Sequence, residues 1–249
     1  MPLRLVTIGI SHYCEKARWA LDRTGLSYVE EAHAPLLHYA ATVRWRTRRT
    51  LPALLGAERA LLDSTEILAW CDAHLAKERR LLPDDEGERR EVAAIEDELD
   101  EHLGPATRRW AYSWGLEVPK TMRRVLAAGL PRAERAVVLA AGGVILAGLQ
   151  RGLKLGPRAI ESAQRRIAEI FASLAPRLER GRFLVGERFT AADLTLAALG
   201  APAVFPPEYG AALPSVADMP EPMQRSVEAF RRTPAGTHVL RMYREHRRD

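Results

Sequence analysis

The first part of the chain alternates between short apolar runs and stretches with helical periodicity. Residues 3–8 form a compact apolar run that predicts a strand. Residues 15–24 predict a helix, because Gly25 follows at the position where a left-handed C-cap is favoured. Residues 26–30 predict a second strand. A strand, a helix and a strand in this order imply a parallel pair joined by a right-handed crossover.

The pattern then changes to a hairpin followed by a helix. Residues 51–55 and 59–62 are apolar runs on either side of a glycine turn, and they predict two antiparallel strands. Asp63, with Glu66 three residues on, is a capping box that opens a third helix. With the less regular segment before the hairpin counted as a helix, the order is β-α-β-α-β-β-α. That order predicts an α/β domain of the thioredoxin-like type.

The remainder of the chain is almost entirely helical in pattern, with apolar residues recurring every three or four positions. Thr190, followed three residues later by Asp193, predicts the start of one of these helices. Residues 78–87 are charged and contain a proline and a glycine, which is typical of a linker. We therefore expect a first domain over residues 1–78 and an all-α second domain over residues 88–249.

Composition excludes several classes of protein. The chain has 249 residues, is 47% hydrophobic and has a formal net charge of +5, which argues against dominant disorder. Its two cysteines cannot form a disulfide scaffold and suit a reducing compartment, so we expect a cytoplasmic protein. The basic residues are scattered among acids without a nucleic-acid-binding motif, so we expect no nucleic-acid partner.

The longest apolar stretch, residues 136–149, raises the question of a membrane span. It contains only 14 residues and three glycines, whereas a spanning helix needs about 18 or more apolar residues. The sequence therefore predicts a helix buried in the protein core and no membrane span.

Five segments, in this order along the chain, carry a resemblance to a known family: residues 11–21, 51–54, 63–67, 80–83 and 183–194. Together they resemble the cytosolic glutathione S-transferase (GST) superfamily, in its bacterial-type members, without matching one class. The resemblance implies an N-terminal thioredoxin-like βαβαββα domain that binds glutathione, followed by an all-helical GST C-terminal domain. It also implies glutathione as co-substrate, a hydrophobic electrophile as second substrate, and a homodimer.

The resemblance assigns glutathione-binding roles to five residues. Leu51 and Pro52 match the cis-proline turn whose backbone pairs with the cysteinyl part of glutathione, although Pro52 could also be an ordinary edge-strand proline. Asp63 and Ser64 match the pair that holds the γ-glutamyl end at a helix N-terminus, and capping alone also explains Asp63. Arg49, in the basic run Arg44 to Arg49, is our choice for the glycine carboxylate.

The catalytic position has three candidates, Ser11, Cys14 and Tyr13. Ser11 takes the place of the reactive group just before the first helix, where it would donate a hydrogen bond to the glutathione sulfur and favour the thiolate. Cys14 could instead form a mixed disulfide with glutathione, and Tyr13 could be the donor. We expect Cys71 to be a small buried apolar residue rather than a reactive one.

The sequence leaves three functions open. The first is a glutathione transferase, with peroxidase or thiol-transferase activity as a possible addition. The second is a thiol-disulfide oxidoreductase acting through Cys14, and the third is a non-catalytic binding or regulatory protein. His33 and His38 have no cysteine or carboxylate cluster beside them in the sequence, so we expect no metal site.

Overall fold

The computed structural model describes residues 2–47 and 49–248, and it begins with a three-stranded sheet. The strands are β1 (Leu3–Ile8), β2 (Tyr28–His33) and β3 (Ala53–Leu55), arranged in the order β2-β1-β3. β1 pairs with β2 in parallel, as the crossover pattern predicted, and with β3 antiparallel. The central position of β1 places the residues that follow its carboxyl end at the middle of the sheet edge.

Three helices cover the two faces of this sheet: α1 (His12–Thr24), α2 (His38–Arg44) and α3 (Ser64–Ala73). Side chains alternate across a strand, so Leu5 packs into the main core beside α1 and α3, while Val6 packs with Ala41 of α2 on the other face. α1 ends at Gly25, which adopts the left-handed conformation that the sequence predicted (φ 70°).

The predicted hairpin is shorter than its apolar pattern suggested. Its first arm contains the three-residue strand β3, but residues 59–62 contribute only an isolated bridge between Leu54 and Leu61. Two backbone hydrogen bonds of 2.8 and 2.9 Å join this pair. Leu61 is buried and Leu62 is half-buried against the small core around Val6, whereas Glu58, Arg59 and Ala60 are exposed.

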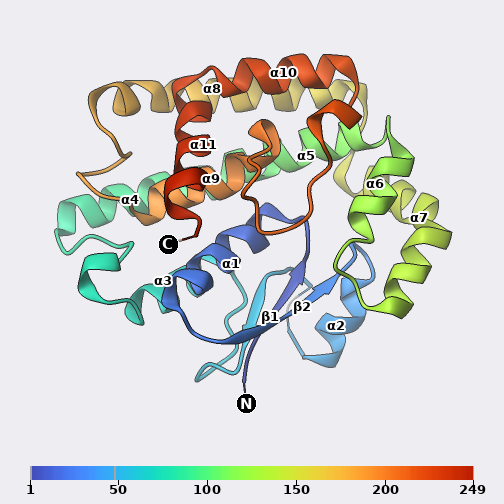
Figure 1. Ribbon diagram of the computed structural model, residues 1–249, viewed down its shortest axis with the longest axis horizontal. Coiled ribbons are helices and arrows are strands. Elements are labelled where there is room, and N and C mark those ends of the chain that lie inside the picture. The colour runs from blue at the N-terminus through green and yellow to red at the C-terminus, as the bar shows by residue number, and fades with distance from the viewer. Residues whose placement is uncertain (1, 48, 249) are drawn as a thin grey trace.

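The rest of the chain forms the helical domain seen above the sheet in Figure 1. Its elements are α4 (Glu86–Glu98), a π-helical turn (Leu99–Leu103), α5 (Gly104–Gly115), α6 (Pro119–Leu126), α7 (Arg132–Leu153), α8 (Pro157–Arg180), α9 (Ala191–Val204), α10 (Glu221–Arg231) and α11 (Pro234–His246). Short 3₁₀ turns occur at Lys77–Arg79 and Val216–Asp218. α9 is buried almost completely and packs against α1, α4, α5 and α11, so it forms the centre of this domain.

The start of α9 confirms a local prediction. Thr190 and Asp193 form the capping box, in which the Thr190 backbone N–H donates to Asp193 Oδ2 at 3.0 Å. The second carboxylate oxygen of Asp193 accepts from the backbone N–H of Leu184 and faces His238 Nε2 of α11, both at 2.9 Å. One buried carboxylate therefore fixes three segments of the domain.

The prediction that residues 136–149 form a buried core helix is wrong. They lie in α7, a helix at the right of Figure 1 that is long and apolar enough to cross a membrane by length and composition, yet only 28% of its most apolar window is buried. Val138, Ile145 and Leu146 pack in a small core beside α6, while Val144 is 75% exposed. The prediction failed because hydropathy gives the apolar character of a helix, but it does not show how many faces of that helix pack against other elements.

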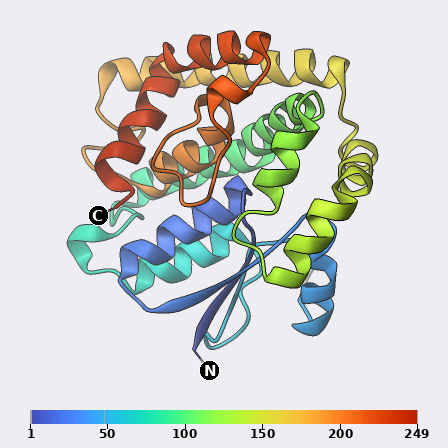
Figure 2. The ribbon, with the colours of Figure 1, turned by 45° about the vertical axis from the view of Figure 1, so that its right-hand side comes forward.

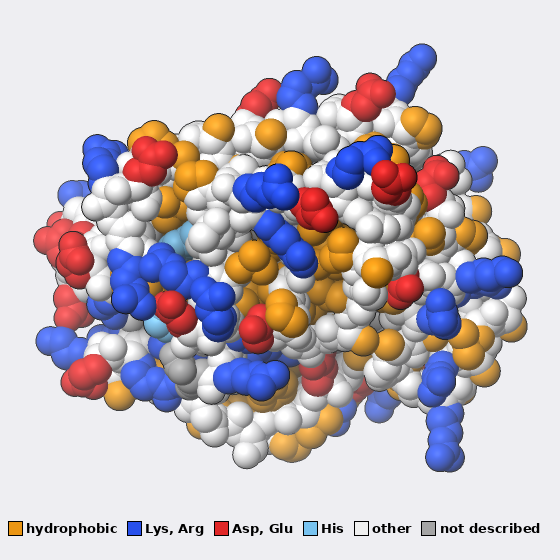
Figure 3. All heavy atoms as spheres, turned by 45° about the horizontal axis from the view of Figure 1, so that its top comes forward, with side chains coloured by type: hydrophobic (Ala, Val, Ile, Leu, Met, Phe, Trp, Pro, Cys, Tyr) orange, Lys and Arg blue, Asp and Glu red, His pale blue; other side chains and the backbone are white. Residues whose placement is uncertain are grey.

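One continuous core joins the two parts of the molecule. Trp19 of α1 is fully buried, and its indole N–H donates to the backbone carbonyl of His246 at 3.0 Å. Figure 2 shows α11 descending toward α1, so the end of the chain returns to its first helix. On the face drawn in Figure 3, basic side chains gather at the left around one acidic side chain, and elsewhere basic and acidic side chains are interleaved.

Candidate active site

A cavity of about 310 Å³ lies at the N-terminus of α1. Its floor comes from the carboxyl end of β1 and the first residues of α1, which are Ile8, Ile10, Ser11, His12 and Tyr13. The loop before β3 adds Arg49, Thr50 and Leu51, and α5 adds Arg108 and Tyr112. The last turns of α7 close one side with Gly148, Leu149, Gly152 and Leu153. The cavity therefore lies where the two domains meet.

Ser11 is the N-cap of α1 and lines this cavity. Its backbone N–H donates to the Ile8 carbonyl at 2.8 Å, and its Oγ accepts from the backbone N–H of Cys14 at 3.5 Å. The Ser11 hydroxyl also forms a hydrogen bond with the Cys14 thiol, which lowers the pKa of that thiol by less than burial raises it. A thiol is a weak acceptor, so the hydroxyl can donate to a ligand in the cavity instead, at the positive end of the helix dipole.

Cys14 lies behind Ser11 and outside the cavity lining, with its side chain completely buried. Its Sγ accepts from the backbone N–H of Ile8 at 3.4 Å. Burial raises the pKa of the Cys14 thiol to about 11, despite the hydrogen bonds from Ile8 and Ser11 that act in the opposite direction. A buried thiol that stays protonated is a poor nucleophile.

Tyr13 lines the cavity, but its hydroxyl is already engaged. The hydroxyl donates to the Asp100 carbonyl at 2.7 Å, and burial together with the negative charge of Asp100 raises the tyrosine pKa. Gly104 makes room for this arrangement, because a Cβ there would lie 2.1 Å from the Tyr13 hydroxyl oxygen. Tyr13 therefore has no free proton to offer a sulfur in this structure.

The structure places only some of the five residues assigned to glutathione binding in the lining of this cavity. The Leu51–Pro52 peptide bond is cis, and Leu51 and Arg49 line the same cavity as Ser11. Asp63 and Ser64 lie outside the cavity lining, at the start of α3. Asp63 Oδ1 accepts from the backbone N–H of Thr65 at 2.9 Å, which confirms its capping role, and its negative charge contributes to the raised pKa of Tyr13.

Apart from Arg49, the members of the basic run that the structure describes lie outside the cavity. Arg44 packs over the ring of Trp45 and lies 4.0 Å from a carboxylate oxygen of Glu31. Arg46 is exposed, and Arg48 falls outside the described residues. Arg49 is exposed as well, but among the described arginines of the run it is the one that lines the cavity.

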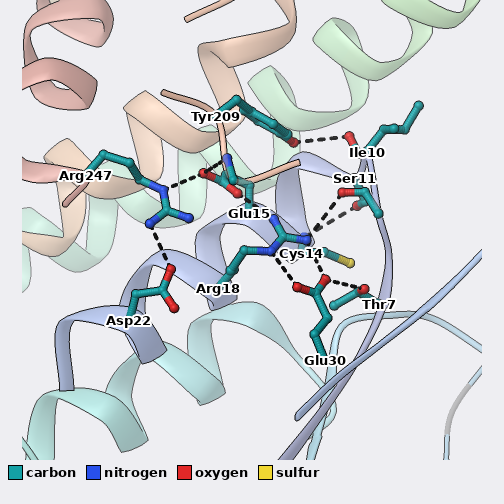
Figure 4. Close-up of polar contacts among 12 residues, drawn as sticks. Thr7, Ile10, Ser11, Cys14, Glu15, Arg18, Asp22, Glu30, Tyr209 and Arg247 are labelled. Atoms are coloured by element: carbon teal, nitrogen blue, oxygen red, sulfur yellow. Dashed lines mark hydrogen bonds and ion pairs between the residues drawn. The ribbon is translucent and has the colours of Figure 1, made fainter. Parts of the chain in front are cut away.

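A buried network of charged side chains holds the N-terminal half of α1 in place (Figure 4). Arg18 pairs with Glu15 and, at 2.6 Å, with Glu30 of β2, while Arg247 from the C-terminal end donates to Glu15 Oε1 at 2.8 Å. Burial alone would raise the pKa of Glu30, but its hydrogen bond and ion pair with Arg18 outweigh this and lower it. Tyr209 adds a hydrogen bond from its hydroxyl to the Ile10 carbonyl at 3.1 Å. The segment that presents Ser11 is therefore held by groups from both domains.

Sequence reasoning missed three of the polar residues that line the cavity: His12, Arg108 and Tyr112. His12 is buried and its Nε2 lies 2.9 Å from the Gly104 carbonyl, an acceptor, so this nitrogen carries the proton. Burial and the nearby charge of Arg108 lower the pKa of His12 to about 3. His12 could have been identified from its position next to Ser11 in the sequence. No local sequence motif contains Arg108 or Tyr112.

The histidines considered for a metal site are engaged in other contacts. His33 Nδ1 lies 2.9 Å from Glu134 Oε2, and its Nε2 lies 3.2 Å from Glu31 Oε1. His38 Nε2 lies 3.1 Å from the Arg49 carbonyl. Among residues 2–47 and 49–248, no group of three or more potential ligands is placed to hold a metal ion. Cys71, as predicted, is a buried free cysteine.

Comparison with known proteins agrees with this architecture. The family description "Glutathione S-transferase, N-terminal domain" matches residues 5–79, and "Glutathione S-transferase, C-terminal domain" matches residues 156–218. The search of curated proteins found no match.

Solved structures with similar folds cover almost the whole chain. A beta-etherase from a Sphingobium species is 17% identical with a TM-score of 0.62, over 97% of this chain and 99% of that one. A possible glutathione S-transferase from Rhodopseudomonas palustris is 14% identical with a TM-score of 0.60, over 99% and 95%. A glutathione S-transferase I bound with lactoylglutathione is 15% identical with a TM-score of 0.56, over 97% and 100%.

At these identities the structural matches show the fold, and the two domain matches show the family. The thioredoxin-like first domain, the helical second domain and the cavity between them are the parts expected of that family. The chain belongs to the glutathione S-transferase superfamily.

Proposed function

We propose that the protein is a glutathione transferase in which Ser11 activates the glutathione thiol for attack on a hydrophobic electrophile. The observation that carries the proposal is the position of Ser11, the N-cap of α1, which lines a cavity of about 310 Å³. Family membership supports glutathione as the ligand, and Leu51 and Arg49 line the same cavity for its cysteinyl backbone and glycine carboxylate.

The role proposed for the protein in this reaction is to favour the deprotonated form of the glutathione thiol. An ordinary thiol has a pKa of about 8.5, so most glutathione is protonated at neutral pH. A hydrogen bond from Ser11 and the positive end of the α1 dipole both favour the thiolate. The thiol proton leaves to solvent, the thiolate forms a C–S bond with the electrophilic carbon, and the leaving group departs with its electron pair.

The alternative thiol-disulfide function is disfavoured by the position of Cys14. Its side chain is fully buried and its thiol has a raised pKa, so the mixed disulfide would require the start of α1 to open. A non-catalytic protein of the same fold is an outcome of the test below. The family resemblance also supports a homodimer and a cytoplasmic location, both of which belong to this proposal.

Replacing Ser11 with alanine tests the proposal. We expect the variant to lose about a hundredfold in kcat/KM for conjugation of glutathione to an activated aryl chloride, because one preorganised donor to the developing charge is lost. Ser11→Thr, which keeps a hydroxyl donor, should retain more activity than Ser11→Ala. Ser215→Ala is the matched control, since Ser215 is the cap of a distant 3₁₀ turn. Equal activities of wild type and Ser11→Ala would contradict the role of Ser11.

A further inference from the structure

A second, apolar cavity adjoins the one that contains Ser11. The two cavities share four wall residues, Ile10, His12, Arg108 and Tyr112. Ser11 lies between Ile10 and His12 in the chain, so the shared wall is next to the position proposed for the glutathione sulfur. A group held in the apolar cavity would therefore lie beside the reacting atom.

The walls of this cavity are almost entirely apolar and close around a space of about 60 Å³. They come from α5, α6, the segment after α9 and the start of α10, with Met122, Val125, Phe205, Leu213 and Met223 among them. Such a lining suits an apolar group of a substrate whose remainder lies in the adjoining cavity of about 310 Å³.

Arg108 is the one charged side chain among the described residues that line the apolar cavity. It is half-buried on α5, and within the described part of the chain it makes no hydrogen bond or ion pair. No aspartate or glutamate lines either cavity among residues 2–47 and 49–248. The neighbouring Arg109 differs, because its guanidinium donates to the Lys154 carbonyl at 3.1 and 3.3 Å.

The other titratable groups around Arg108 do not neutralise it. His12 is neutral, because burial and the charge of Arg108 lower its pKa to about 3. Burial raises the pKa values of Tyr112 and Tyr209, so both hydroxyls remain protonated. The apolar cavity thus contains a cation without a counter-ion from the protein.

We propose that the second substrate is an apolar electrophile carrying a carboxylate, and that Arg108 binds this carboxylate and so sets selectivity for acidic over neutral electrophiles. A guanidinium at an apolar wall has lost part of its hydration, and a carboxylate restores the lost interactions through two parallel N–H···O bonds. Arginine matches that geometry, which lysine does not. The inference rests on the proposed function, since it names the class of substrate for the same site.

The step itself is unchanged by the carboxylate. In the test substrate, chlorodinitrobenzoate, the thiolate sulfur forms a bond to the ring carbon that bears chlorine. The C–Cl bond breaks and chloride leaves with the electron pair, while the carboxylate stays ionised and bound to Arg108.

The kinetic test compares chlorodinitrobenzoate with the matching neutral chlorodinitrobenzamide, each rate divided by the uncatalysed rate with glutathione. We expect the wild type to favour the acid, and Arg108→Gln to lower the acid-to-amide ratio of kcat/KM about tenfold. Arg108→Lys should recover part of the ratio, and the control Arg109→Gln should leave it unchanged. An Arg108→Gln ratio equal to that of the wild type overturns the inference.

A binding test separates failure of this inference from failure of the proposed function. Dinitrobenzoate and dinitrobenzamide lack a leaving group and are titrated calorimetrically into the wild type and Arg108→Gln without glutathione. Tighter binding of the acid by the wild type, lost in Arg108→Gln, supports the inference even if no conjugation occurs. Loss of S-methylglutathione binding in Arg108→Gln, with no effect on dinitrobenzoate, would assign Arg108 to glutathione and overturn it.

Discussion

The environment of Cys14 separates two chemistries that the sequence left open. Ser11 and Cys14 lie within one turn at the start of α1, yet only Ser11 lines the cavity, while Cys14 points into the protein. The helix dipole acts on both positions, but for Cys14 the desolvation of a thiolate dominates and raises the pKa to about 11. Burial therefore decides which of the two groups can react.

We predict that both cysteines of the native protein resist thiol reagents. Burial raises the pKa of Cys14 to about 11 and that of Cys71 to about 12, so at a pH of about 8 roughly a thousandth or less of either thiol is ionised. Titration with an aromatic disulfide reagent should label neither thiol rapidly, and both after unfolding in guanidinium. Rapid labelling of one native thiol, abolished by Cys14→Ala, would revive the oxidoreductase hypothesis.

The buried neutral His12 predicts a defined pH dependence of stability. Its pKa is about 3 in the folded protein and about 6.5 when unfolded, so the unfolded state binds more protons at acidic pH. Stability should fall by roughly 1.4 kcal/mol per pH unit as the pH drops from about 6.5 toward 3, and this contribution is absent above about 6.5.

Urea unfolding of the wild type and His12→Gln at several pH values checks this slope. The difference in unfolding free energy between the two should shrink as the pH falls below about 6.5. His74→Gln is the matched control, because it makes the same substitution at an exposed position. A constant difference between wild type and His12→Gln across this range would refute the assignment of His12 as a neutral buried group.

At the scale of elements, the two faces of α7 have different surroundings. Its inner face supplies a small core and the glycines that line the cavity, while its outer face is exposed. Gly148 approaches the loop after β2 so closely that a Cβ there would lie 2.7 Å from Leu36 Cδ1. Gly143 lies on the exposed face, where a Cβ would meet nothing within 4 Å.

This pair of glycines gives a matched prediction. Gly148→Val should weaken S-methylglutathione binding about tenfold, because the added side chain fills space at the cavity wall and displaces Leu36. Gly143→Val makes the same change in helix propensity without touching the cavity and should bind like the wild type. Calorimetry of both variants checks this, and equal affinities would show that α7 does not limit the glutathione site.

The elements themselves differ in how far local sequence could predict them. The end of α1 at Gly25 and the capping residues Asp63 and Thr190 follow from hydrogen bonds within a few residues of the chain, and the structure confirms each. The exposure of α7 could not be predicted, because it depends on which faces have neighbours. The predicted second hairpin arm is reduced to the Leu54–Leu61 bridge, since Arg59 and Ala60 at its start are exposed.

At the scale of the whole molecule, the site is built from segments that are distant in sequence. Local motifs and the family resemblance identified Ser11, Arg49 and Leu51, which line one cavity. They could not identify Arg108, because its proximity to Ser11 comes from the packing of α5 beside α1. The family therefore predicts the residues proposed for glutathione binding better than those proposed for the electrophile.

The most direct test of the central claim is a calorimetric titration of the purified protein with reduced glutathione and with S-methylglutathione. We predict saturable binding of both, at one site per chain, because our proposal places the peptide backbone of the ligand as well as its sulfur in the cavity lined by Ser11. S-methylglutathione has no thiol to exchange, so its binding cannot depend on Cys14. Absence of binding of either compound at millimolar concentration would contradict the account and leave a protein of this fold that does not use glutathione.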